Sequence, residues 1–128
     1  MSGLGFVDAI AAAALGVPAG PIRLQVGIPG ANGFGEAHIT TNERRMRQLA
    51  DLGYQSAISF VRDVASNWTK IAHGAGGRLI LIFSKSGYDL RIVVQLAGQA
   101  TDPFWSVTTA IPSRVCRETI AYTRATTP

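Results

Sequence analysis

The chain has little of several residues on which common protein functions depend. Its 128 residues include one cysteine, Cys116, so neither a disulfide framework nor a cluster of thiolate metal ligands can form within one chain. The two histidines, His38 and His73, stand without partners at metal-ligand spacing, and the eight acidic residues form no tight group of the kind that a two-metal nuclease needs. The sequence therefore predicts a protein that holds no metal and no cofactor.

Long apolar runs are also missing. The most apolar stretch near the start, residues 6–17, contains Asp8 and is shorter than the ~20 residues that span a bilayer. It lacks the basic start of a signal peptide, so residues 1–20 are interpreted as an N-terminal helix or linker. Residues 21–128 are then expected to form a single domain, because a chain of this length is too short for two. Neither glycine-rich segment ends in the Lys-Ser/Thr of a phosphate-binding loop.

Positive charge is present in moderate excess. Twelve basic residues against eight acidic ones give a formal net charge of +4, and all the basic residues but Lys70 and Lys85 are arginines. Guanidinium groups bind phosphate through two parallel hydrogen bonds, which fits a polyanionic partner. A GC-rich genome explains the same arginine excess equally well, so composition leaves both readings open.

Hydrophobic periodicity predicts two helices in the first half of the chain. The first begins between residues 36 and 41, with Thr40 and Glu43 at capping-box spacing, and ends near Leu52. The second covers residues 56–66. Its buried face is expected to consist of residues at spacings of three and four, namely Ala57, Phe60, Val61, Val64 and Trp68.

The second half of the chain changes to a period of two. Strands are expected at residues 22–26, 78–83, 88–96, 104–111 and 119–123, with short links that favour antiparallel neighbours. In the strand 104–111, simple alternation places Trp105, Val107 and Thr109 on one face and Ser106 and Thr108 on the other. Helices followed by strands predict an α+β fold, with N-terminal helices packed on a four- to five-stranded antiparallel sheet.

The residue types that remain for chemistry are imidazole, guanidinium and hydroxyl groups. RNA supplies its own nucleophile, the 2′-OH, so one histidine and several arginines suffice for cleavage without metal. His38 follows a glycine-rich loop and is suited to proton transfer, although a capping or surface histidine is the simpler interpretation. Arg91, on the more polar face of an apolar strand, is either a phosphate ligand or part of a solvated sheet face.

The order of several segments resembles one protein family. The segments GPIRLQVG, GFGEAHI, LADLGYQSAISFVRDVASNW, GGRLILIF, YDLRIVVQL and WSVTTAIPSR resemble the phage and polymorphic-toxin branch of the barnase–EndoU–colicin–RelE-like (BECR) nucleases. The resemblance covers residues 21–114. It implies a barnase/RelE-like fold and a metal-independent endoribonuclease, often acting on tRNA. It also implies delivery within a larger secreted bacterial toxin, as in contact-dependent growth inhibition, and neutralisation by a cognate immunity protein.

The resemblance also implies roles for particular residues. His38 matches the family's histidine and is expected to act as general acid or base, Thr109 to bind a non-bridging oxygen, and Arg91 to stabilise the phosphate charge. Where many relatives carry a second histidine, this chain has TTNERRM, so one of the arginines there is expected to stand in. The expected substrate contacts are Arg44, Arg45, Arg78, Lys85, Thr108 and Arg114.

Two other functions fit the same residues. One is a non-catalytic module that binds nucleic acid or protein with the same fold. The other is a toxin that transfers a nucleotide or ADP-ribose, which the low content of acidic residues disfavours, since that reaction usually enlists a glutamate.

Overall fold

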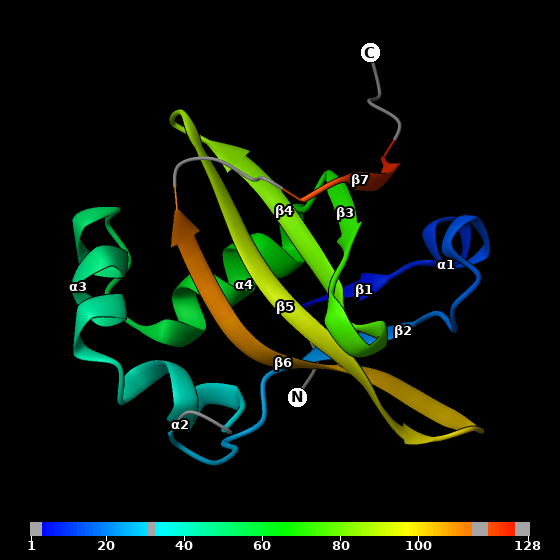
Figure 1. Ribbon diagram of the computed structural model, residues 1–128, viewed down its shortest axis with the longest axis horizontal. Helices are drawn as coiled ribbons and strands as arrows, with labels where there is room; N and C mark the ends of the chain where they lie inside the picture. The colour runs from blue at the N-terminus through cyan, green and yellow to red at the C-terminus, as the bar shows by residue number, and fades with distance from the viewer. Residues whose placement is uncertain (1–3, 31–32, 114–117, 125–128) are drawn as a thin grey trace.

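The computed structural model describes residues 4–30, 33–113 and 118–124, and this part of the chain forms four α-helices and a seven-stranded sheet (Figure 1). The helices are α1 (Ala9–Leu15), α2 (Gly35–Thr40), α3 (Glu43–Asp51) and α4 (Ala57–Asn67). The strands are β1 (Gly5–Val7), β2 (Gly20–Arg23), β3 (Lys70–His73), β4 (Leu79–Lys85), β5 (Tyr88–Gln99), β6 (Asp102–Ser113) and β7 (Ile120–Thr123). The predicted α+β class is confirmed.

The sheet is larger and more varied than expected. Its strand order is β1-β2-β6-β5-β4-β3-β7, and the five strands from β6 to β7 pair antiparallel, as the periodicity predicted. The prediction of a purely antiparallel sheet of four to five strands is wrong at the other end. There β2 joins β6 in parallel, and β1 adds a further antiparallel strand. The central strands curl strongly around α4 (Figure 1).

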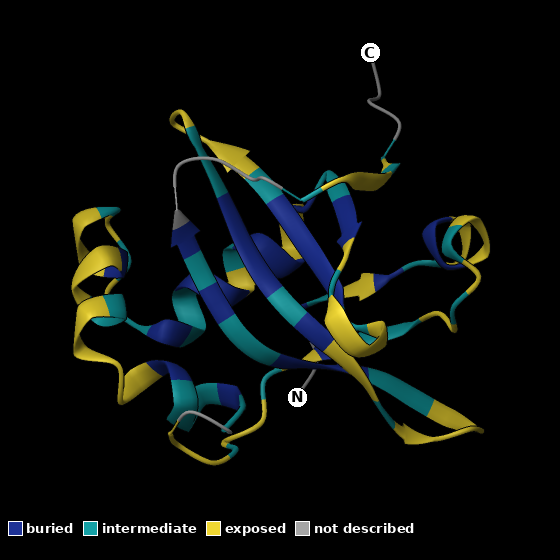
Figure 2. Cartoon of the chain, in the orientation of Figure 1, coloured by how far each residue is buried: buried dark blue, intermediate teal, exposed yellow. Residues whose placement is uncertain are grey.

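Helix α4 supplies the centre of the core. Ser56 caps its first turn, because its hydroxyl accepts a hydrogen bond from the backbone N–H of Ser59 at 3.2 Å. The predicted buried face is confirmed, since its five residues are all at most 1% exposed, although Trp68 follows the last helical residue. This face packs against β4, β5 and β6, and the buried residues concentrate along these strands and α4 (Figure 2).

The first predicted helix is divided into α2 and α3. The prediction that Thr40 caps a single helix is wrong: the side chain of Asn42 accepts from the backbone N–H of Arg45 at 3.0 Å and begins α3. Thr40 instead ends α2, and its hydroxyl donates to the carbonyl of Glu36. The break turns α3 so that Leu49 is fully buried, and α2 and α3 both pack beside β6.

The N-terminal segment packs into the same core as the rest of the chain. Two buried tryptophan side chains hold it, since the indole N–H of Trp68 donates to the carbonyl of Phe6 and that of Trp105 to the carbonyl of Pro18, each at 3.1 Å. The segment 1–20, interpreted from the sequence as helix or linker, therefore supplies strand β1 as well as α1. None of the described helices is long and apolar enough to cross a membrane.

A β-bulge interrupts the pairing of β5 with β6. Val93 lies opposite Thr109 and Val94 opposite Val107, so the strand β6 has one extra residue at this point. Val107 and Ala110 are fully buried, whereas the two threonines between them are both partly exposed. The predicted alternation, which placed Thr109 on the same face as Val107, is therefore wrong. The bulge turns both threonines toward the outer face of the sheet, the face that α4 does not cover.

Candidate functional site

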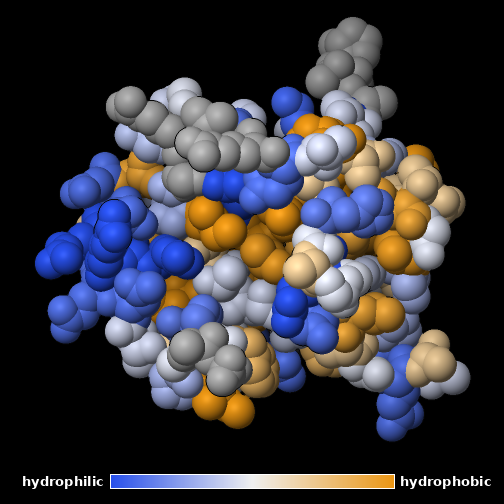
Figure 3. All heavy atoms as spheres, in the orientation of Figure 1, coloured by the Kyte–Doolittle hydropathy of each residue, from blue (hydrophilic) through white to orange (hydrophobic). Residues whose placement is uncertain are grey.

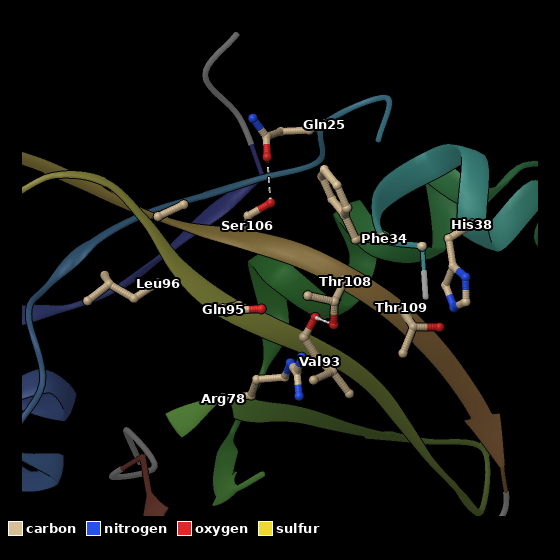
Figure 4. Close-up of a pocket in the computed structure, with 12 residues that line it drawn as sticks. Gln25, Phe34, His38, Arg78, Val93, Gln95, Leu96, Ser106, Thr108 and Thr109 are labelled. Atoms are coloured by element: carbon tan, nitrogen blue, oxygen red, sulfur yellow. Dashed lines mark hydrogen bonds between the residues drawn. The ribbon is translucent and has the colours of Figure 1, made fainter. Parts of the chain in front are cut away.

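A cleft of about 510 Å³ lies on the outer face, between strands β5 and β6 and the segment that leads into α2 (Figure 4). Four residues that the sequence singled out come together in it: His38 from α2, Arg78 from the start of β4, and Thr108 and Thr109 from β6. The other polar side chains that line it are Gln25, Gln95 and Ser106. The described lining contains no carboxylate, so the cleft is suited to an anionic ligand.

The imidazole of His38 is held in a defined orientation. Its Nδ1 lies 2.8 Å from the carbonyl oxygen of Gly30. A carbonyl only accepts hydrogen bonds, so Nδ1 carries the proton and Nε2 has the lone pair in the neutral ring. The ring therefore has the tautomer that a general base needs, and it lines the same cleft as the hydroxyl of Thr109 (Figure 4).

Thr109 is tied to helix α3 by Arg45. The Nη1 of Arg45 donates to the hydroxyl oxygen of Thr109 at 3.0 Å and also to the carbonyl oxygen of Ala110. Burial lowers the pKa of Arg45 from its ordinary value, yet a guanidinium stays charged in proteins. Because the oxygen of Thr109 accepts from this cation, the hydroxyl hydrogen is polarised and is left to donate to a ligand. Thr108 donates to the carbonyl of Val93 at 3.1 Å.

The remaining predicted residues lie elsewhere. Arg91 is buried beside the cleft but is not part of its lining, and it makes an ion pair with Glu118 at 2.6 Å. Arg44 is exposed on α3, where strongly hydrophilic side chains gather (Figure 3). Lys85 lies in the β4–β5 hairpin and pairs with Asp63 of α4 at 3.2 Å. Arg114, like Cys116, lies outside the described residues.

Lys85 belongs to a separate polar network that joins the hairpin to α4. The hydroxyl of Tyr54 donates to Asp63 at 2.5 Å, and Asn67 donates to the same carboxylate at 3.0 Å. Burial acts to raise the pKa of Asp63, but the hydrogen bonds from Tyr54, Lys85 and Asn67 outweigh it and the pKa is lowered. Burial and the bond to Asp63 raise the pKa of Tyr54. This network anchors the hairpin and does not reach the cleft.

Sequence reasoning did not select three residues of the cleft wall: Gln25, Phe34 and Ser106. Neutral polar residues beside a strand look like an ordinary solvated face, and Phe34 looks like one more apolar residue in a loop. The glycines around Phe34 were the available signal. A Cβ on Gly27 would lie 1.9 Å from the carbonyl oxygen of Phe34, and one on Gly33 would lie equally close to that of Ile28. Such close backbone approach requires glycine at these two positions.

Comparisons with known proteins add no relative. No family model matches the chain, and neither curated protein sequences nor solved structures yield a match. Within the described part of the chain, no three His, Cys, Asp or Glu side chains are grouped so as to hold a metal ion. The function is therefore argued from the cleft itself.

Proposed function

We propose that the cleft binds RNA and cleaves its backbone, with His38 as the proton-transfer group. The observation that carries this proposal is the anchored imidazole. Its Nδ1–H is held by the carbonyl of Gly30, and the ring lines a cleft that also contains Arg78 and two threonine hydroxyls. The imidazole supplies a base, Arg78 a cation, and the hydroxyl of Thr109 a hydrogen-bond donor for a phosphate group, whereas the hydroxyl of Thr108 already donates to the carbonyl of Val93.

The reaction follows from the chemistry of RNA. Nε2 of His38 takes the proton of a ribose 2′-OH, the 2′-oxygen attacks the adjacent phosphorus, and the bond from phosphorus to the 5′-oxygen breaks. The protonated imidazole, or water, returns a proton to the leaving 5′-oxygen. The products are a 2′,3′-cyclic phosphate and a 5′-hydroxyl. The nucleophile belongs to the substrate, so the proposed reaction uses no metal.

Charge stabilisation is assigned to the groups around the phosphate. The hydroxyl of Thr109, polarised by Arg45, donates to a non-bridging oxygen, and the guanidinium of Arg78, from the turn that precedes β4, supplies positive charge. Arg91 is assigned a structural part in this proposal, because its ion pair with Glu118 occupies it. Arg44 extends the positive surface outside the cleft on the exposed side of α3.

The biological setting is proposed from the resemblance to BECR nucleases. On that basis the chain is a toxin domain delivered to a target cell as part of a larger bacterial protein, its substrate is tRNA, and an immunity protein neutralises it. The anionic character expected of an inhibitor that covers this cleft agrees with the absence of acidic residues from its described lining.

The test is cleavage of total tRNA in the presence of EDTA, followed on a denaturing gel. General acid–base catalysis contributes about 10²- to 10⁴-fold, so His38→Ala is expected to reduce the rate by at least about 100-fold. His73→Ala is the matched control, because His73 is exposed at the end of β3 and does not line the cleft. Equal activity in wild type and His38→Ala would refute the assignment.

A second candidate function is binding of RNA without turnover. It is favoured by one observation: among the described residues that line the cleft, His38 is the one imidazole and there is no carboxylate, so a second group for proton transfer is missing from that lining. This candidate predicts retention of intact tRNA at low salt with no fragments, even when cell extract is added to supply a host factor.

A further inference from the structure

One wall of the cleft differs in chemical character from the side chains of His38 and Arg78. Its described side chains include the amides of Gln25 and Gln95, the hydroxyl of Ser106 and the ring of Phe34, all of them neutral (Figure 4). An amide side chain carries both hydrogen-bond donors and an acceptor, and an aromatic ring has a flat apolar face on which another ring can stack. Such a surface suits an uncharged heteroaromatic group better than a phosphate.

The backbone of Phe34 is held in place by hydrogen bonds to Ile28. Ile28 and Phe34 form an isolated β-bridge, with N–H to O distances of 3.0 Å and 2.9 Å in the two directions. Gly27, with a φ of +73°, allows the backbone of Phe34 to approach so closely that a Cβ could not be accommodated. Little entropy is then lost when a flat ligand stacks on the ring.

The amide of Gln25 is also oriented. The hydroxyl of Ser106, a residue only 5% exposed, donates to Oε1 of Gln25 at 2.8 Å. The backbone carbonyl of Gln25 accepts from the N–H of Glu36 at 2.8 Å, which ties Gln25 to the first turn of α2. With Oε1 directed to Ser106, the two N–H donors of the amide remain to recognise acceptor atoms on a ligand.

From these contacts we propose that Phe34, Gln25 and Ser106 form a nucleobase subsite: the base stacks on Phe34 and receives hydrogen bonds from the amide of Gln25, while Ser106 positions that amide. The inference rests on the proposed function, because it takes the ligand to be RNA. His38 lies one helical turn after Phe34 and lines the same cleft. A strand whose phosphate reaches His38 therefore brings a nearby base to Phe34.

Binding of two uncleavable probes separates this subsite from the phosphate site. One probe is a short RNA with every 2′-OH methylated, and the other is the same sugar–phosphate backbone without bases. Dissociation constants are measured by fluorescence anisotropy at one fixed salt concentration. Stacking of one base on an aromatic ring typically strengthens binding about tenfold or more. We therefore expect wild type to bind the base-bearing probe at least about tenfold more tightly.

Variants then assign the preference to the named residues. Phe34→Leu is expected to remove about tenfold of affinity for the base-bearing probe and leave the abasic probe unchanged, whereas Phe34→Tyr, which keeps a ring, retains both affinities. Phe6→Leu is the matched control, since Phe6 is 60% exposed on β1. Base discrimination is measured with four versions of the methylated probe, each carrying a single kind of base. Ser106→Ala is expected to reduce the differences in affinity among these four probes without lowering the affinity for the abasic probe. Unfolding curves of all variants confirm that each is folded at the assay temperature.

The outcomes distinguish the two proposals. Equal wild-type affinity for the two probes, or equal losses with Phe34→Leu and Phe6→Leu, would overturn the subsite and leave the cleavage proposal to its own assay. A base preference that depends on Phe34, in a protein whose tRNA cleavage does not depend on His38, would support the subsite and refute the catalytic assignment. Failure of wild type to bind either probe would overturn both.

Discussion

Arg45 is expected to stabilise the fold by closing the outer edge of β6. Strand β2 pairs with β6 only at Trp105 and Ser106, so the edge beyond that point faces α2 and α3. There Arg45 donates to the carbonyl of Ala110 and to the hydroxyl of Thr109. An unpaired sheet edge and a carbonyl without its donor both destabilise a fold.

The expected loss of unfolding free energy on replacing Arg45 follows from its hydrogen bonds to Thr109 and Ala110. A hydrogen bond from a charged donor contributes about 1.5–3 kcal/mol net when it is buried. Arg45 is half-buried, so solvent weakens its bonds, and replacement by methionine recovers the desolvation energy of the guanidinium and keeps the packing of the stem. We expect Arg45→Met to lower the free energy of unfolding by about 1–2 kcal/mol, which corresponds to a decrease in Tm of roughly 4–8 °C for a domain of this size.

Urea and thermal unfolding of Arg45→Met and Arg44→Met, each compared with wild type, measure this effect. Arg44 is the matched control, because it neighbours Arg45 on the same helix and is exposed. Its replacement should change stability by no more than ~0.5 kcal/mol. In the tRNA assay, Arg45→Met should also reduce cleavage, since Thr109 loses the cation that polarises its hydroxyl. Equal stabilities of the two variants would refute the argument that Arg45 closes the sheet edge.

Two further predictions concern the hairpin network and the loop before α2. Hydrogen bonds lower the pKa of Asp63 against the opposing effect of burial, so its stabilisation is present above pH ~4 and is lost as the pH falls through the lowered pKa. Between pH ~5 and ~3, urea midpoints should therefore fall more steeply for wild type than for Asp63→Asn, whereas exposed Asp51→Asn should keep the wild-type slope. In the loop, Gly27→Ala should destabilise the protein by at least ~2 kcal/mol, because it combines a positive φ with a backbone clash. Gly16→Ala, at a similar φ in open space, should cost only ~1 kcal/mol; equal losses would show that the clash is relieved.

The elements that the sequence predicted well are those whose apolar residues keep one period over several turns. Helix α4 repeats its buried face from Ala57 to Val64, and the pair β4–β5 is joined by a tight turn, so both were located closely. Strands β1 and β3 were missed, since each has only three or four residues and a period barely emerges over that length, whereas β2 and β7, equally short, were predicted as five-residue stretches at 22–26 and 119–123. The parallel pairing of β2 with β6 joins residues more than 80 positions apart, and no local pattern records it.

In the candidate site too, some side chains could be predicted from the sequence and others depend on contacts that no local pattern records. His38 and Thr109 were selected because the resemblance to BECR nucleases implies a role for each, and the fold places both in one cleft. The bulge that turns Thr109 outward was not predictable, since a strand read by alternation alone buries it beside Val107. Arg91 fits the alternation and lies on the outer face, yet Glu118, more than 25 residues later, pairs with it.

The ion pair of Arg91 with Glu118 affects which arginines remain to bind a phosphate. A buried arginine already paired with a carboxylate, as Arg91 is with the partly exposed Glu118, attracts an anion less than one whose partners are neutral. Arg45 and Arg78 donate to uncharged oxygens, those of Thr109 and Ala110 for the first and that of Ala75 for the second, so these bonds do not neutralise either guanidinium; Arg78 lines the cleft, and Arg45 acts on it through Thr109. The cleft thus presents the cation of Arg78 and the polarised hydroxyl of Thr109 for a phosphate, while the neutral wall of Phe34 and its amide neighbour is left to a base. One ribonucleotide unit, charged at one side and flat and uncharged at the other, matches this division.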